Sequence, residues 1–330
     1  MNYAQISTEN HQQPYFPFAG VPPWLRFALL CTLIMMAALW LEPYCAPLCR
    51  VTAAQVTELL RLTGFEPHLQ GDKITLSGFA VRIVTECTPL YASLLYSAFV
   101  LAQPAAWKHT FAGLVAGIIV ITVFNLLRIS LITSAGPVVS TFLFDVLHVY
   151  LGQVAMLMLV VACAQFWLRW SIGGATPIPF LLRAVCLATL FFILWVVVNR
   201  SYVALLDKLV AAIFSLLYPG NLLLTPRPLA VYNHTFAVPL FLALIFAGGK
   251  SWTVNRFAAT VGGVYYIAAW HALFRVSHVV WTALGVQGMM PVHQTVYLLG
   301  QFLLPFLLWL WLDGRVNRMG RVDEPEALQY

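Results

Sequence analysis

Three side chains that together can carry out nucleophilic chemistry stand far apart in this sequence: Cys87, Arg128 and His148. A cysteine thiolate is a strong nucleophile, and an imidazole beside it can accept its proton and later protonate a leaving amine. An arginine stays protonated and can hold a developing oxyanion or a substrate carboxylate. Each residue alone also has an ordinary role in packing or at a membrane interface. The set predicts acyl-transfer chemistry if the fold brings the three side chains together.

Several neighbours of this trio are candidates for a supporting role. Asp145 precedes the histidine by one helical turn, so it is placed to orient the imidazole or to act as a solvated cap. Asn125 precedes the arginine by about one turn and can bond to a substrate or to a neighbouring helix. Glu86 and Thr88 flank the thiol. A carboxylate at Glu86 raises the pKa of that thiol unless a nearby cation offsets it.

The composition indicates a membrane protein. Hydrophobic residues make up 61% of the chain and charged residues 9%, against about 25% charged in soluble domains. The net charge of +6 comes from basic residues that mostly stand singly at the ends of apolar runs, which is typical of membrane orientation. No basic stripe with interleaved aromatic residues is present, so nucleic-acid binding is not expected. No cofactor is expected either.

Eight apolar runs are predicted to be membrane helices. With the N-terminus inside, the basic residues of the short loops fall on the cytoplasmic side, as the positive-inside rule requires. Both termini are then cytoplasmic, and the cysteine, arginine and histidine all map to the outer ends of spans. The first run follows a polar segment and is expected to stay as an anchor rather than to be cleaved. The eight runs are Trp24–Leu41, Leu90–Trp107, Thr110–Leu127, Val149–Trp167, Leu182–Val198, Phe236–Gly248, Phe257–Phe274 and Thr295–Leu312.

The segment between the first two runs, residues 42–86, predicts a small outer α/β subdomain. Cys45 and Cys49 lie on this side in a C-x3-C pattern. Their spacing is compatible both with a disulfide and with two free thiols. Helical periodicity is followed by a glycine stop and then by alternating residues on either side of a Ser-Gly pair. The expected elements are a helix at Thr52–Leu62 and strands at Lys73–Leu76 and Phe79–Val84.

An internal repeat relates the two parts of the chain. The segment around Arg128 recurs around Arg275, and a histidine follows each arginine, 20 residues later in the first part and 18 in the second. A step of 41 residues back from each arginine reaches Cys87 in the first part and His234 in the second. Chance likeness between apolar helices is the alternative. The polar matches favour two parallel four-span halves, with His234, Arg275 and His293 as second-half counterparts. No third ligand accompanies these histidines, so no metal site is expected.

The first half resembles the exosortase/archaeosortase family of multi-spanning cysteine transpeptidases over residues 20–170. The resemblance implies that Cys87 is the nucleophile, His148 the acid and base, and Arg128 an anchor for an oxyanion or substrate. Pro89 stands where the family often has glycine. The second half looks like a degenerate copy that lost the thiol. The matching motifs are Glu86-Cys87-Thr88, Asn125-x-x-Arg128-Ile129, Gly136-Pro137, and His148 with Gly152.

The sequence therefore predicts an all-α polytopic membrane protein of about eight transmembrane helices in two parallel four-helix repeats. The expected activity, implied by the resemblance, is cleavage of C-terminal sorting signals on exported proteins with a transmembrane tail. The Cys87 thioester would pass to water or to an amine, glycan or lipid acceptor, at the outer face of a bacterial or archaeal inner membrane. A non-enzymatic transporter or scaffold is the alternative, and a membrane acyltransferase is a third. The expected parts are a tail at 1–23, a catalytic half at 24–174, a degenerate repeat at 175–312 and a tail at 313–330.

Overall fold

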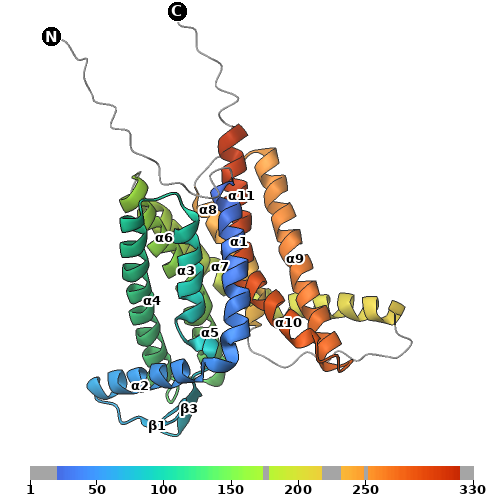
Figure 1. Cartoon of the computed structure of the whole chain (residues 1–330). Helices are drawn as coiled ribbons and strands as arrows, with labels where there is room; N and C mark the ends of the chain where they lie inside the picture. Colours follow the sequence, from blue (N-terminus) through green and yellow to red (C-terminus); the bar gives the residue numbers. More distant parts are fainter. Residues whose placement is uncertain (1–20, 174–177, 218–231, 249–251, 320–330) are drawn as a thin grey trace, which may run out of the picture.

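The protein is described by a computed structural model over residues 21–173, 178–217, 232–248 and 252–319 (Figure 1). Most of both predicted tails, 1–23 and 313–330, lies outside these residues. Within the described ranges, five helices are long and apolar enough to cross a membrane, and one bent pair of helices makes up to six. An all-α polytopic membrane protein is therefore confirmed, whereas eight spans are not reached by length.

Helices make up most of the described residues, and a small sheet stands between α2 and α3 in the sequence. The first half ends with α6, and the second begins with α7. The helices are α1 (Pro23–Leu41), α2 (Ala46–Leu62), α3 (Leu90–Ala102), α4 (Trp107–Ala135), α5 (Thr141–Val149), α6 (Met156–Ile172), α7 (Ile178–Leu217), α8 (Ala237–Ala247), α9 (Val254–Thr282), α10 (Met289–Leu298) and α11 (Leu304–Met319). The strands are β1 (His68–Gln70), β2 (Lys73–Leu76) and β3 (Phe79–Arg82), and the short turns are η1 (Glu42–Tyr44), η2 (Thr85–Cys87), η3 (Tyr150–Ala155), η4 (Asn233–Thr235) and η5 (Leu299–Leu303).

Two predicted spans are shorter than expected. The run predicted as Leu90–Trp107 forms α3, which stops at Ala102 because Pro104 follows and forces the preceding Gln103 into extended backbone. The run predicted at Phe236–Gly248 forms the 11-residue helix α8. Most of its side chains are buried inside the protein rather than facing lipid. Both helices are apolar on every side, as helices enclosed by other helices are.

The α/β subdomain of residues 42–86 lies across one end of the first half. α2 packs against α4 there, as Figure 1 shows. Its buried face carries Ala53, Val56 and Leu60, which contact Ile74 of β2 and Ile129 of α4. Spacings of three and four residues place these side chains on one side of a helix. α2 is thereby fixed against the helix that carries the candidate arginine.

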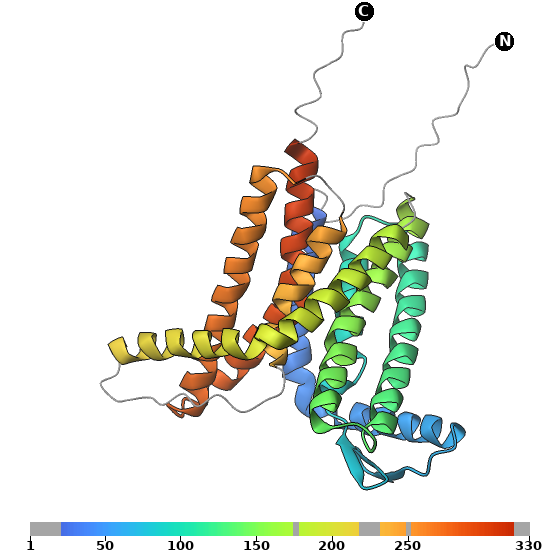
Figure 2. The same cartoon turned by 180° about the vertical axis from the view of Figure 1, so that it is seen from behind.

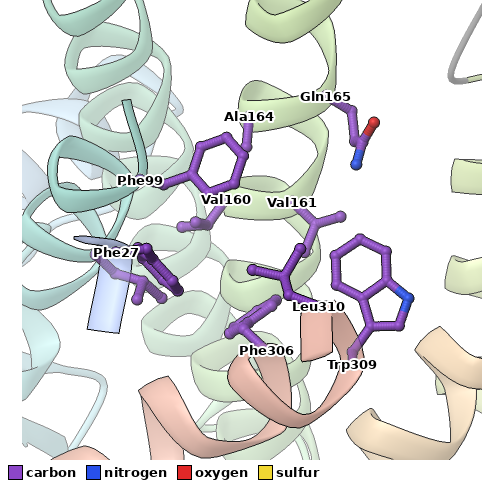
Figure 3. Close-up of a pocket in the computed structure, with 10 residues that line it drawn as sticks. Phe27, Phe99, Val160, Val161, Ala164, Gln165, Phe306, Trp309 and Leu310 are labelled. Atoms are coloured by element: carbon purple, nitrogen blue, oxygen red, sulfur yellow. The ribbon is translucent and has the colours of Figure 1, made fainter. Parts of the chain in front are cut away.

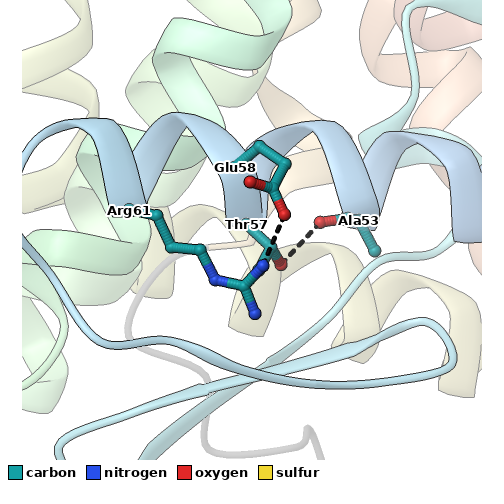
Figure 4. Close-up of polar contacts among 4 residues, drawn as sticks. All are labelled: Ala53, Thr57, Glu58 and Arg61. Atoms are coloured by element: carbon teal, nitrogen blue, oxygen red, sulfur yellow. Dashed lines mark hydrogen bonds and ion pairs between the residues drawn. The ribbon is translucent and has the colours of Figure 1, made fainter.

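The opposite face of α2 is polar. Arg61 pairs with Glu58 at 2.5 Å, and both side chains are more than half exposed. On the buried side, the Thr57 hydroxyl donates to the Ala53 carbonyl of the same helix at 2.8 Å (Figure 4). An exposed pair of this kind contributes little to stability. The ion pair lies on the solvated side of the helix and the Thr57 bond within it, so neither contact forms a site.

The sheet is antiparallel in the order β1-β2-β3. Leu76 pairs with Phe79 across the predicted Ser77-Gly78 turn. Both turn residues have positive φ, 49° and 82°, as a two-residue hairpin turn of the primed type requires. The prediction of two strands missed β1, whose three residues pair with β2.

The second half contains a similar succession of elements. A short turn leads into a short apolar helix, then into a 29-residue helix, and then into a helix that ends in a π-helical turn; α4 and α9 have the same length. α7 packs along α8. Figure 2 shows it as a long diagonal helix whose last part runs sideways near α10. There Val210 and Phe214 pack on Val279 of α9, at the same end of the bundle as α2 (Figure 1).

One apolar core joins the two halves and includes residues of α1, α3, α6, α8 and α11. Figure 3 shows its small cavity of about 30 Å³, where Phe27, Phe99 and Phe306 converge. Gln165 is the single polar residue that lines it. A transport path needs polar groups at mid-depth. The interior of this cavity therefore gives no support to the transporter alternative.

Candidate active site

Cys87 is the last residue of the short turn η2, which connects the sheet to α3. Its main-chain N–H donates to the Val84 carbonyl at 2.9 Å. The Thr88 hydroxyl donates to the Thr85 carbonyl at 2.7 Å, and the Thr88 side chain is buried. These local bonds fix the backbone on both sides of the thiol. The side chain of Glu86, by contrast, is exposed.

Arg128 and Asn125 on α4 both bind the main-chain carbonyl of Cys87. Asn125 Nδ2 donates to that oxygen at 3.0 Å and Arg128 Nη2 donates to it at 3.3 Å. Arg128 Nη1 also donates to the Gly152 carbonyl at 3.1 Å. The two side chains are one helical turn apart and are buried. In the described part of the chain, Arg128 forms no ion pair with a carboxylate.

His148 lies on α5, one turn before the glycine that Arg128 contacts. Its ring stacks on Phe144 at 5.8 Å between centroids, and Phe144 in turn meets Phe79 of β3 at 4.9 Å. Gly136, at the end of α4, lies so close to Phe79 that a Cβ there would be 2.2 Å from the ring. The sheet therefore packs directly against the helix that carries the histidine.

A π-helical turn, η3, follows α5 and contains Gly152. A Cβ at this glycine would stand 3.2 Å from Arg128 Nη1, so glycine permits the close approach of the guanidinium. Single π-helical turns often occur at functional sites. Arg128 acts electrostatically on both Cys87 and His148. The guanidinium therefore connects the turn that carries the thiol to the helix that carries the imidazole.

The thiol of Cys87 is not a ready-made thiolate. Burial raises its pKa above the ordinary value for cysteine and Glu86 raises it further, whereas a backbone hydrogen bond at Val84 and the charge of Arg128 lower it, with burial the largest effect. A group with a raised pKa needs a base to become nucleophilic near neutral pH. Asp145 also acts electrostatically on His148. No hydrogen bond between the two occurs among the described contacts.

Each of the three candidate residues Asn125, Arg128 and His148 has one buried polar atom without a hydrogen-bond partner within the described chain: Asn125 Oδ1, Arg128 Nε and His148 Nδ1. Buried polar atoms are nearly always paired in folded proteins, and each exception requires a specific explanation, of which a catalytic role is one. Asn125 and Arg128 bind the turn that carries Cys87, and His148 lies within electrostatic range of Arg128. They can donate to and accept from a peptide group.

Two predicted positions along the helices were wrong in detail. Arg128 was predicted at the outer end of a span that stops at Leu127, but α4 continues to Ala135 because the sequence stays apolar. His148 was predicted at the start of a span, but its helix begins at Thr141, where Ser140 caps it by accepting from Leu143 N–H at 3.3 Å. Both residues therefore lie about two turns inside their helices.

The cysteine pair of the outer subdomain is not bridged. Cys45 and Cys49 are free thiols, as are the other four cysteines. Cys49 is buried next to the Thr85 hydroxyl at 4.0 Å. The alternative of two free thiols is therefore the one that the structure has.

The second-half counterparts gather in a different arrangement. Arg275 forms a buried ion pair with Asp207 of α7 at 2.6 Å. The His234 ring lies 4.7 Å from Phe274, and burial, followed by neighbouring cationic groups, holds the pKa of His234 well below its usual range. His293 Nδ1 bonds to the Ser277 hydroxyl at 3.0 Å. No cluster of three or more His, Cys, Asp or Glu side chains that could hold a metal occurs in the part of the chain that the structure describes.

Sequence reasoning missed three residues near the site, Gln153, Tyr297 and Gln301. The side chains of Gln153 and Gln301 form a hydrogen bond between the two halves, and Tyr297 interacts electrostatically with Gln153. The recurrence of Tyr-Leu-Gly-Gln in the first half as Tyr-Leu-Leu-Gly-Gln in the second could have marked them.

Comparison with known proteins gives one match. The model of the transmembrane exosortase family matches residues 20–164, a range that includes Cys87, Arg128 and His148 and ends before the second half. No curated protein and no solved structure matches the chain.

Proposed function

We propose that the chain is a membrane-embedded cysteine transpeptidase with Cys87 as its nucleophile, because residues 20–164 match the model of the transmembrane exosortase family. The family is one of cysteine transpeptidases that act on exported proteins with C-terminal sorting signals. The proposed substrates are such proteins with a transmembrane tail, and no cofactor takes part.

The observation that carries this proposal is the environment of Cys87. Its carbonyl is held by a buried amide and a buried guanidinium that has no carboxylate partner in the described chain. Asn125, Arg128 and His148 each keep one buried polar atom without a partner among the described residues. An unneutralised buried cation is costly to keep, and it becomes favourable when negative charge develops beside it.

The first step of the proposed reaction is proton transfer from the Cys87 thiol to His148. The thiolate then attacks the scissile peptide carbonyl, forming an S–C bond while the carbonyl π electrons move to oxygen. The positive charge of Arg128 stabilises this oxyanion. As the oxyanion collapses, the C–N bond breaks and the imidazolium gives its proton to the leaving amine.

The second step releases the product. Water or an amine on an acceptor loses a proton to His148 and attacks the thioester carbonyl. The S–C bond breaks, and the thiolate of Cys87 recovers the proton. Hydrolysis and transfer to an amine, a glycan amine or a lipid amine differ only in the attacking group.

The second half is proposed to be a degenerate copy of the first, in parallel orientation. The equal lengths of α4 and α9 and the π-helical turns η3 and η5 support a duplication. His234 replaces the thiol, and Asp207 neutralises Arg275. This half therefore supports the site rather than duplicating its chemistry. The proposed location is the inner membrane, with both termini cytoplasmic and the site at the outer face.

The test is C-terminal peptide mass spectrometry of exported membrane proteins in cells that produce either the native chain or the Cys87→Ala variant. The variant is expected to leave C-terminal tails uncleaved. Cys163→Ala is a matched control, because Cys163 is a partly buried thiol of α6 away from the site, and it is expected to leave processing intact. Unchanged processing in Cys87→Ala refutes the proposal.

A mass measurement of the intact chain separates the two enzymatic alternatives. The mass of the native chain is compared with that of Cys87→Ala, which cannot form the thioester. A peptide thioester adds the mass of a protein fragment, whereas a fatty-acyl thioester adds the mass of one acyl chain. Both adducts are removed by hydroxylamine. An acyl adduct alone supports the acyltransferase alternative instead.

A further inference from the structure

The two halves meet through a pair of glutamine side chains. Gln301 Nε2 donates to Gln153 Oε1, and the Gln301 side chain is almost fully buried. Gln153 lies in the π-helical turn η3 and Gln301 in η5, so the contact joins like positions of the two halves. The hydroxyl of Tyr297 from the second half also interacts electrostatically with the Gln153 side chain.

This contact leads directly to the thiol. Gln153 follows Gly152, whose carbonyl accepts from Arg128 Nη1 at 3.1 Å. The other end of the same guanidinium, Nη2, donates to the Cys87 carbonyl at 3.3 Å. Tyr297 itself lies within electrostatic range of Glu86 and Cys87. Hydrogen bonds and the covalent backbone therefore connect Gln301 of the second half to the turn that carries Cys87.

We propose that Gln301 and Tyr297 are positioning residues for Cys87: they fix Gln153 and, through the Gly152 carbonyl and Arg128, the turn that carries the thiol. The inference rests on the proposed function in that it takes Cys87 as the reacting group. It assigns the second half a part in the first half's site.

The local geometry explains why the link is tight. A π-helical turn closes its hydrogen bonds over one more residue than the surrounding helix, so a side chain in it can leave the regular helix face and point between the halves. Gly300 stands so close to Trp270 that a Cβ would be 2.2 Å from the indole nitrogen, and the indole N–H donates to the Val296 carbonyl at 2.7 Å. The backbone before Gln301 is thereby held in place, and the amide has little freedom to move away.

Loss of the hydrogen bond between Gln153 and Gln301 is expected to change the chemistry of the Cys87 thiol, which a general loss of helix packing does not. Once Gln153 is released, the Gly152 carbonyl no longer holds Arg128 in place. The guanidinium then lowers the pKa of the Cys87 thiol less than it does in the native chain. The reactivity of the thiol is expected to shift towards higher pH, whereas a merely structural defect lowers the unfolding temperature and leaves the pH midpoint of the folded protein unchanged.

The experiment measures alkylation of Cys87 by iodoacetamide in the full chain in lipid nanodiscs, by mass spectrometry of the Cys87 peptide, from pH 6 to 11. Gln301→Met, which keeps the length and removes the amide, is expected to move the midpoint up by about half a pH unit, or about 3-fold less thiolate at pH 7. Tyr297→Phe is expected to give a smaller shift in the same direction. The double variant Gln153→Met with Gln301→Met is expected to equal the larger single effect, since both act through one link.

Tyr202→Phe is the matched control, because it removes a partly buried hydroxyl that bonds to His271 at 2.8 Å in the second half but does not contact Gln153 or Gln301 in the described contacts. It is expected to leave the midpoint unchanged. Midpoints equal to that of the native chain in both Gln301→Met and Tyr297→Phe overturn the inference. Alkylation does not depend on substrate processing, so failure here is distinguishable from an unaltered Cys87→Ala phenotype, which refutes the proposed function instead.

Discussion

Replacement of Gly152 by alanine tests how much the Arg128 clamp, meaning its two hydrogen bonds to the Gly152 and Cys87 carbonyls, contributes to catalysis. The added Cβ stands 3.2 Å from Arg128 Nη1, a contact that forces the guanidinium to move by a few tenths of an ångström. Its two hydrogen bonds already measure 3.1 and 3.3 Å, at the long end of the range for N–H···O bonds. A further displacement therefore breaks or strongly weakens at least one of them.

The size of the effect follows from the charge on the donor. A hydrogen bond from a charged group contributes about 1.5–3 kcal/mol, and partial loss of one amounts to about 1–2 kcal/mol. This corresponds to a roughly 5- to 30-fold lower rate of substrate processing. Alanine also favours helix over glycine by up to about 1 kcal/mol, which offsets the lost bond in the stability of the fold. Activity is expected to fall while the unfolding temperature stays nearly unchanged.

The assay compares C-terminal processing and thermal unfolding of Gly152→Ala with those of Gly262→Ala. Gly262 lies on α9, and the position that a Cβ would take there has no heavy atom of the described chain within 4 Å. The control therefore carries the helix effect without the clash, and it is expected to process substrate at the native rate. Native processing in Gly152→Ala, or an equal loss in both variants, refutes the role given to the clamp.

Three further outcomes follow from the same contacts. Asn125→Leu removes the 3.0 Å bond to the Cys87 carbonyl at nearly constant volume, and processing is expected to fall by roughly 10-fold, equivalent to about 1.4 kcal/mol; native rates in this variant contradict a role in fixing the turn. Glu86→Gln removes a charge that raises the pKa of the Cys87 thiol, so the pH midpoint of thiol alkylation is expected to fall, and an upward shift is the contrary result. Asp207→Asn leaves Arg275 buried without its counter-charge, and thermal unfolding is expected to show a loss of about 3 kcal/mol, whereas an unchanged unfolding temperature means that the pair is not needed for the fold.

Local patterns in the sequence predicted local structure well. The start of α1, the strand β2 and the turn at Ser77-Gly78 depend on neighbouring residues, and all three appear where the sequence placed them. β1 was missed because its three residues show no alternation that marks a strand. It forms only because β2 offers a partner.

The ends of the long helices depend on contacts between residues far apart in the sequence, which local patterns do not predict. Hydropathy placed the ends of spans at Arg128 and near His148. Both residues nevertheless lie inside helices, because other parts of the protein rather than water pack around them. α7 extends to Leu217 through charged residues such as Asp207, which hydropathy excludes from a span. The partner that makes this extension stable is Arg275, 68 residues further on.

The candidate site shows the same division. Residue types and topology brought the thiol, guanidinium and imidazole to one end of the bundle. Two contacts depend on backbone geometry, which residue types alone do not predict. One is the bond of Arg128 to a main-chain carbonyl, and the other is the contact of Gln153 with Gln301. The two π-helical turns that produce this geometry share the residues Leu-Gly-Gln, a recurrence that marks the positions without giving the contact between them.

The difference between the two arginines leads to a last prediction, about restoring the thiol in the second half. In the proposed duplication His234 takes the position of Cys87, and Arg275 acts on it electrostatically as Arg128 acts on the native thiol. Arg275, however, is already neutralised by Asp207 at 2.6 Å, so its charge is not free to stabilise a thiolate or an oxyanion. The double variant Cys87→Ala with His234→Cys is therefore expected to remain inactive in C-terminal processing, with a second-half thiol that is alkylated more slowly than Cys87 at neutral pH. Restored processing in this variant means that the unpaired state of Arg128 is not what distinguishes the two halves.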